Sequence, residues 1–134
     1  MKYGCVLLAD NHINMLGGVR ILLEDVFSVV VMVADETSLF QAIVQMEPAL
    51  VIVNLSLPVT CNKNIMSQLS SRHPSLKIIV LSVHDEPAAV QAAFAAGVSG
   101  FVLTRSAVTD LVEAVRAVLE GRSYVSPDAR LRST

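Results

Sequence analysis

The sequence ALVIVNLSLP, residues 49–58, joins an apolar run to a short turn that ends in proline. Its apolar residues are near-continuous and rich in β-branched side chains, as expected of a parallel strand covered on both faces. Asn54 stands where that strand would end. Open α/β sheets place their functional groups beyond the carboxyl ends of their strands. The stretch therefore predicts a parallel α/β fold and raises the question of why a carboxamide stands at this position.

Four further apolar runs of the same kind occur, at residues 5–9, 28–34, 77–82 and 100–103. Segments with the apolar period of a helix follow each of the five runs. Their apolar positions are Leu16, Val19, Leu23 and Val26; Leu39, Ile43 and Met46; Ile65 and Leu69; Val90, Ala93, Phe94 and Gly97; and Val108, Leu111, Val112, Val115, Val118 and Leu119. This (βα)5 alternation predicts a flavodoxin-like, doubly wound parallel sheet with strand order 2-1-3-4-5.

Signals for helix ends agree with this pattern. Ser38 and Gln41 have the spacing of a capping box for the second helix, and Pro87 would open the fourth. Gly121 would close the fifth helix, after which the sequence becomes polar. We therefore expect one domain over residues 1–121 and a polar linker or tail over residues 122–134.

The overall composition limits the possible partners of the chain. Its 134 residues are 53% hydrophobic and 16% charged, and the formal net charge is -2. With a pI near 5.8, the chain lacks the basic balance typical of nucleic-acid-binding domains, so we expect no direct contact with nucleic acid. Cys5 and Cys61 are spaced like free thiols of a reducing compartment. No signal peptide and no apolar run of ~18 residues are visible, so we expect a cytoplasmic protein with no membrane contact.

Five stretches together carry a more specific resemblance. They are VLLADNH (6–12), ALVIVNLSLP (49–58), IIVLSVHDE (78–86), AAGVSGFVL (95–103) and LVEAVRAVLEGRSYVSP (111–127). Over residues 3–127 the chain resembles the receiver domain of bacterial two-component response regulators. It looks most like the receivers that precede a LuxR-type (NarL/FixJ) helix-turn-helix domain. The resemblance implies that the linker leads toward such a DNA-binding domain, missing from this sequence.

The resemblance also assigns expected roles to residues near the strand ends. Such receivers hold Mg²⁺ with two acidic residues after the first strand, where this chain has Asp10 and Asn11. The aspartate that accepts the phosphoryl group from a histidine kinase corresponds to Asn54. A backbone carbonyl that helps to bind the metal would come from Ser56. Two of the three acidic positions are therefore carboxamides.

Four further positions complete the expected site. The hydroxyl that contacts the phosphoryl group is kept as Ser82, whereas Thr104 replaces the usual lysine. Phe101 fills the place of an aromatic switch residue. Gln91 lies on a fourth helix without charged residues, and receivers of this group commonly use that region to dimerise or to meet an output domain.

An amide is a poor nucleophile and cannot form an acyl phosphate, so we expect no phosphorylation at Asn54. Mg²⁺ depends on carboxylate ligands, so weak binding at Asp10 is possible but not expected, and no cofactor is predicted. A lysine at position 104 would lack its carboxylate partner, which makes Thr104 consistent with a pocket rebuilt to be stable without phosphate. No nucleophile paired with a base is visible, so we expect no enzyme activity.

The sequence thus predicts a phosphorylation-independent receiver of a LuxR-type transcriptional regulator, acting as a signalling and dimerisation module. Its expected partners are its own DNA-binding domain and a second copy, and a histidine kinase or another regulatory protein is a further candidate. Two alternatives remain open. One is a conventional receiver altered at the acceptor position; the other is a binder of a small ligand in the crevice by Asp10, Asn54 and Ser82.

Overall fold

The computed structural model describes residues 3–9, 17–54, 72–73, 75–82 and 87–126. Within them, six strands form one parallel sheet: β1 (Tyr3–Ala9), β2 (Phe27–Val33), β3 (Leu50–Asn54), β4 (Ile78–Ser82), β5 (Gly100–Leu103) and β6 (Tyr124–Val125). The helices are α1 (Gly17–Val26), α2 (Glu36–Met46), α4 (Pro87–Ala95) and α5 (Ala107–Leu119), and the short 3-10 helix η2 (Thr104–Ser106) precedes α5. The strand order is β2-β1-β3-β4-β5-β6, which confirms the predicted order and adds a sixth strand.

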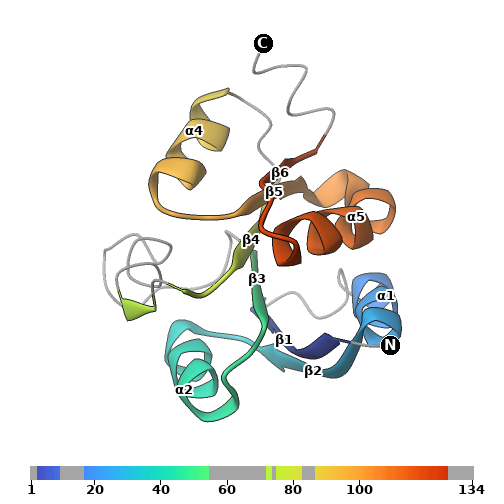
Figure 1. Ribbon diagram of the computed structural model, residues 1–134, viewed down its shortest axis with the longest axis vertical. Helices are drawn as coiled ribbons and strands as arrows, with labels where there is room; N and C mark the ends of the chain where they lie inside the picture. The colour runs from blue at the N-terminus through green and yellow to red at the C-terminus, as the bar shows by residue number, and fades with distance from the viewer. Residues whose placement is uncertain (1–2, 10–16, 55–71, 74, 83–86, 127–134) are drawn as a thin grey trace.

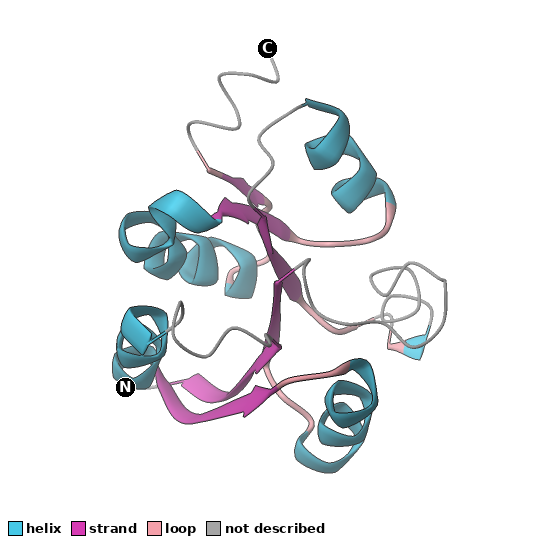
Figure 2. Cartoon of the chain, turned by 180° about the vertical axis from the view of Figure 1, so that it is seen from behind, coloured by secondary structure: helices cyan, strands magenta, loops and turns pink. Residues whose placement is uncertain are grey.

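Helices cover both faces of the sheet, with α1 and α5 on one side and α2 and α4 on the other (Figures 1 and 2). Each face has its own apolar core. Leu8 of β1 packs with Leu23 and Leu111 on the side of α1 and α5, whereas Leu7 packs with Leu39 on the side of α2. Because successive residues of a strand point to opposite faces, a strand between two helical layers must be apolar throughout.

Strand β2 departs from this rule. Among the described strands it pairs only with β1, so it forms an edge of the sheet. Ser28 and Val29 are exposed, and Val29 keeps 44% of its surface accessible. The expectation that every apolar run would be buried on both faces is therefore wrong for β2, because the continuous apolar pattern alone does not distinguish an edge strand from a central one.

The start of α2 corrects a second prediction. The helix begins at Glu36, and its N-cap is Asp35, whose Oδ1 accepts a hydrogen bond of 2.7 Å from the Ser38 backbone N–H. Ser38 therefore lies inside the first turn and does not cap the helix. The capping box of Ser38 with Gln41 is wrong because the aspartate three residues earlier already satisfies the free N–H.

The other two helix ends agree with the sequence. Pro87 is the first residue of α4, where its missing N–H costs no intrahelical bond. Gly121 follows the end of α5 with φ 88, and the Arg122 N–H donates to the Ala117 carbonyl at 2.8 Å. This is a Schellman motif, in which glycine adopts the left-handed conformation without steric cost.

The segment after α5 is more ordered than its polar composition suggested. The polar composition predicts a linker or tail over residues 122–134, but Tyr124 and Val125 form β6, which pairs with β5. Residues 127–134 lie outside the described residues, as does the expected helix around Ile65 and Leu69.

Candidate functional site

Three residues of the predicted site mark the carboxyl ends of three neighbouring strands. Asn54 ends β3, Ser82 ends β4, and Thr104 directly follows β5. The sheet order places these strands side by side, so the three positions form one row, here called the carboxyl rim. Asp10, Asn11 and Ser56 were also predicted to lie there, but they fall outside the described residues.

The hydroxyl groups of the rim are shielded from water. Ser82 keeps only 2% of its surface exposed. The Oγ1 of Thr104 is buried and has no hydrogen-bond partner among the described residues. A buried hydroxyl without a partner loses its bonds to water and gains nothing in return, so it costs stability. Thr104 thus forms no polar network with the part of the chain that the structure describes.

The two residues predicted for the switch and interaction face differ in burial. Phe101 is fully buried in β5 and packs into the core on the side of α2 and α4. Gln91 is exposed on α4, as are Ala88, Ala92 and Ala95. This side of α4 therefore presents small, uncharged side chains, and the roles predicted for Phe101 and Gln91 stay predictions.

Comparison with known proteins identifies the family. Residues 6–116 match the family described as the response regulator receiver domain. The chain belongs to this family. The resemblance noted in the sequence is thereby confirmed at the level of the family.

Two curated relatives of the receiver domain illustrate its setting. This chain is 28% identical over 127 residues to the transcriptional regulatory protein DegU of Brevibacillus brevis, and the match covers 94% of this chain and 54% of the relative. It is 31% identical over 124 residues to the transcriptional regulatory protein RcsB of Escherichia coli K12, covering 89% of this chain and 57% of the relative. The chain spans little more than half the length of these relatives.

Solved structures share the fold of this receiver domain. The RcsB response regulator of Salmonella typhimurium superposes with a TM-score of 0.90 at 28% identity, over 99% of this chain and 68% of that one. The isolated receiver domain of RcsB from Salmonella enterica serovar Typhimurium, solved with the phosphomimetic BeF3-, superposes with a TM-score of 0.87 at 27% identity. The match covers 99% of this chain and 100% of that one. A LuxR-family response regulator from Aurantimonas sp. SI85-9A1 also superposes with a TM-score of 0.87, at 28% identity, over 96% of this chain and 94% of that one.

The residues that the resemblance assigns to Mg²⁺ binding are a poor chemical match for that ion. Mg²⁺ takes hard oxygen ligands and gives up its water reluctantly, so carboxylate charge decides its affinity. By the resemblance, the ligand positions would supply one carboxylate, Asp10, and two carboxamides, Asn11 and Asn54, of which Asp10 and Asn11 lie outside the described residues. Within the described residues, no group of three or more His, Cys, Asp or Glu side chains could hold a metal ion.

The C-terminal side of the rim contains a residue that the sequence analysis missed. Ser126 is fully buried, and its Oγ accepts a hydrogen bond of 3.0 Å from the Leu103 N–H at the end of β5. The signal for this contact was the β-forming pair Tyr124 and Val125 directly before it, which the polar composition of the segment concealed.

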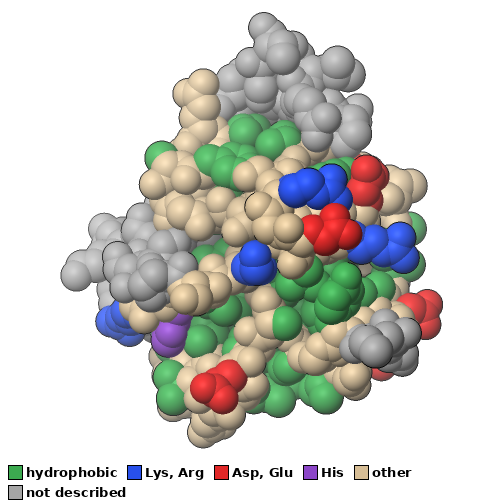
Figure 3. Space-filling view, in the orientation of Figure 1, with side chains coloured by type: hydrophobic (Ala, Val, Ile, Leu, Met, Phe, Trp, Pro, Cys, Tyr) green, Lys and Arg blue, Asp and Glu red, His purple; other side chains and the backbone are tan. Residues whose placement is uncertain are grey.

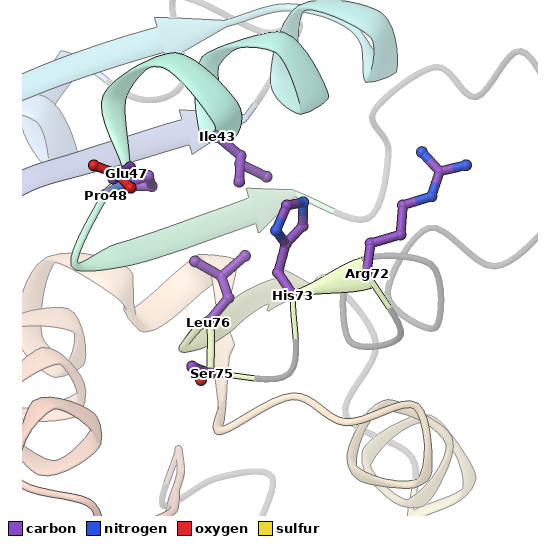
Figure 4. Close-up of a pocket in the computed structure, with 7 residues that line it drawn as sticks. All are labelled: Ile43, Glu47, Pro48, Arg72, His73, Ser75 and Leu76. Atoms are coloured by element: carbon purple, nitrogen blue, oxygen red, sulfur yellow. The ribbon is translucent and has the colours of Figure 1, made fainter.

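A separate cavity of about 390 Å³ lies near the amino ends of β3 and β4, at the end of these strands away from the carboxyl rim (Figure 4). It opens between the last turn of α2 and the residues that lead into β4, and His73 and Leu76 line it together with Ile43. Nearby, the Arg72 guanidinium lies 4.9 Å from the centre of the Phe40 ring. This cavity was not predicted, and it is not part of the carboxyl rim.

The charged residues of the receiver domain are mixed in sign over α5. Acidic and basic side chains lie next to one another in this region (Figure 3), and Arg122 forms an ion pair with Glu120. Arg116 and Glu113 are also exposed on this helix. In the part of the chain that the structure describes, no helix is both long enough and apolar enough to span a membrane.

Proposed function

We propose that this receiver domain acts as a protein-interaction module of a LuxR-type transcriptional regulator and that it works without phosphorylation of residue 54. The observation that carries the proposal is the presence of Asn54 at the carboxyl end of β3, the position that corresponds to the phosphoacceptor. The amide nitrogen delocalises its lone pair into the carbonyl, so neither atom of the carboxamide is a good nucleophile. Asn54 therefore cannot form the acyl phosphate that an aspartate would form.

The other changes at the rim support the same conclusion. Two carboxylates about 5 Å apart repel each other by roughly 3 kcal/mol at an effective dielectric constant near 20, and a bound cation relieves that repulsion. With Asn11 and Asn54 in place, the repulsion is absent and no cation is needed. A lysine at position 104 would be desolvated without a carboxylate partner, and Thr104 avoids this cost. The three residues form a consistent set in which charge has been removed together.

Without an acyl phosphate, the state of the domain would follow what binds to it. A receiver with two conformations still shifts toward the one that a partner binds more tightly. DegU and RcsB are transcriptional regulatory proteins by name, and RcsB dimers have been solved bound to DNA. By analogy, the partners of this domain would be a C-terminal DNA-binding domain of the same chain and a second copy. The domain would have no enzyme activity of its own.

Intact mass spectrometry tests the proposal directly. The protein is incubated with Mg²⁺ and acetyl phosphate, next to a receiver domain that has aspartate at the acceptor position as a positive control. We expect the control to gain one phosphoryl group and this protein to keep its mass. A stable gain of one phosphoryl group on this protein would show that the pocket is reactive and would refute the proposal.

A further inference from the structure

At the end of the described chain, a side-chain hydrogen bond takes the place of the next backbone bond between β5 and the segment after it. The Tyr124 N–H donates to the Ser99 carbonyl at 3.2 Å, and the Ser126 N–H donates to the Phe101 carbonyl at 2.9 Å. These two bonds have the spacing of a parallel ladder along β5. The next bond of such a ladder would run from the Leu103 N–H to the Ser126 backbone carbonyl. The Ser126 Oγ takes this bond instead, at 3.0 Å.

The sequence after Ser126 does not favour a continued strand. Pro127 follows Ser126, and prolines are confined to edge strands, bulges and the first residue of a strand. A serine just before this proline can satisfy the last free N–H of β5 with its side chain while its own backbone turns away. The Leu103 N–H lies inside the protein, where losing its acceptor would be costly.

The side chains of β6 anchor it to both layers of the fold. Tyr124 packs into the core shared by α1 and α5, and Val125 packs against the core on the side of α2 and α4. Ser126 is fully buried beside the end of β5. With only two residues in the strand itself, β6 depends on these few contacts, and short strands with few buried contacts open most easily.

We propose that Ser126 is a positioning residue: its hydroxyl takes the place of the next ladder bond and holds the carboxyl end of β5 to the end of β6. Leu103 is the chain neighbour of Thr104, so a displacement of the rim at Thr104 would act on this hydrogen bond. Removing the hydroxyl releases β6 and the end of β5 together. This inference does not depend on whether Asn54 accepts a phosphoryl group.

Amide hydrogen exchange followed residue by residue by NMR on the whole chain tests this role. In Ser126→Ala we expect the Leu103 amide to exchange roughly ten-fold faster or more, because its N–H loses a buried acceptor. The Ile79 amide, in the neighbouring strand β4, should change far less. Ser123→Ala removes an exposed hydroxyl from the same segment and should leave both amides unchanged.

The comparison of the two amides separates local release from a general loss of stability. If Leu103 exchanges as slowly in Ser126→Ala as in the wild type, the hydroxyl does not hold the end of β5. If Leu103 and Ile79 accelerate by the same factor, Ser126 contributes only to the stability of the whole domain. Either result overturns the proposal.

Discussion

Ser82 pairs in register with Leu103, so Thr104 lies one residue beyond Ser82 along the carboxyl edge of the sheet. Asn54 pairs with Leu81 and therefore lies one residue short of Ser82. The three positions of the rim advance by one residue from each strand to the next. Ser82 lies between Asn54 and Thr104 along the rim, so changes at these two positions act on the same small region and are best tested together.

An aspartate at position 54 alone should allow little phosphorylation. In Asn54→Asp, the new carboxylate has only Asp10 to help it bind Mg²⁺ and no lysine at position 104. The carboxylate expected at position 11 and the lysine expected at position 104 are still missing in this variant. We expect weak labelling by Mg²⁺ and acetyl phosphate, measured as the fraction of intact protein that gains one phosphoryl group.

The triple variant Asn11→Asp, Asn54→Asp, Thr104→Lys is the matched comparison. It supplies the charge expected at each of the three positions, and its labelled fraction should exceed that of the single variant by at least about ten-fold, equivalent to ~1.4 kcal/mol. Robust labelling of the single variant would contradict the idea that Asn11, Asn54 and Thr104 form one jointly altered set.

Removing the hydroxyl of Thr104 should not harm the fold. Its Oγ1 is buried without a hydrogen-bond partner among the described residues, so Thr104→Val replaces an unsatisfied polar atom with a methyl group of similar size. Such changes are neutral or stabilising, by up to about 1 kcal/mol. Urea unfolding monitored by circular dichroism measures the difference in the free energy of unfolding.

The same chemical change at Thr109 provides the control. The Thr109 Oγ1 donates a hydrogen bond of 2.9 Å to the Ser106 carbonyl at the start of α5, so Thr109→Val removes a made bond and should cost roughly 0.5 kcal/mol. A loss of stability in Thr104→Val larger than in Thr109→Val would mean that the Thr104 hydroxyl has a stabilising partner.

Gly100 is a position where the packing leaves no room for a side chain. A Cβ there would lie 3.1 Å from the Ile79 Cγ1 and 3.2 Å from the Val118 Cγ2. Both atoms belong to the buried core between β4, β5 and α5, and they cannot move freely. We expect Gly100→Ala to lower the free energy of unfolding by roughly 1–3 kcal/mol, as in other overpacked cores.

Gly4 in β1 is the matched control for Gly100. A Cβ at Gly4 would meet nothing within 4 Å, so Gly4→Ala should change stability by less than about 0.5 kcal/mol. The midpoint of urea unfolding should therefore fall for Gly100→Ala only. Equal midpoints for the two variants would show that α5 can move away from β5 at little cost.

The cap of α2 predicts a pH dependence. The hydrogen bond from the Ser38 backbone N–H, with a further contribution from the Ser38 side chain, lowers the pKa of Asp35 from its ordinary value of 3.8. A carboxyl group with a lowered pKa in the folded state stabilises the fold above its unfolded pKa. That stabilisation is lost as the pH falls below 3.8 and through the lower folded pKa.

Thermal unfolding of the wild type and Asp35→Ala at several pH values measures this effect. The wild type should be the more stable at pH 7, and the difference should shrink as the pH falls from about 5 toward 3. Asp35→Asn keeps an acceptor for the Ser38 N–H but does not titrate, so its stability relative to Asp35→Ala should stay constant. If the difference in thermal stability between the wild type and Asp35→Asn stays constant across this pH range, the ionised Asp35 carboxylate does not stabilise α2.

Much of the fold was predictable because the apolar runs alternate with helical segments in a regular way. Residues 50–53 are buried on both faces, as their continuous apolar pattern predicted, and the regular alternation of strands and helices favours the doubly wound order. The N-cap of α2 was missed because Asp35 and Ser38 are both good capping residues, and only the structure shows which begins the helix. Strand β6 was missed because two residues are too few for a periodic pattern.

The candidate site was predictable in part. The rim position of Ser82 and Thr104 follows from where their strands end, so the sequence could locate it. The role of Ser126 could not be predicted, because it depends on a contact between residues 23 positions apart in the chain. The predicted roles of Asp10, Asn11 and Ser56 concern residues outside the described ones and stay predictions.

Strand β2 has a consequence for how the domain behaves at high concentration. Its seven residues, FSVVVMV, carry no charge and no proline, and among the described strands only β1 pairs with it. Natural edge strands usually carry lysine, proline or a bulge, which prevents another chain from adding to the sheet. A lysine at the exposed Val29 would supply such a charge, so Val29→Lys is the first change to make when the purified domain has to be kept monomeric for structural work.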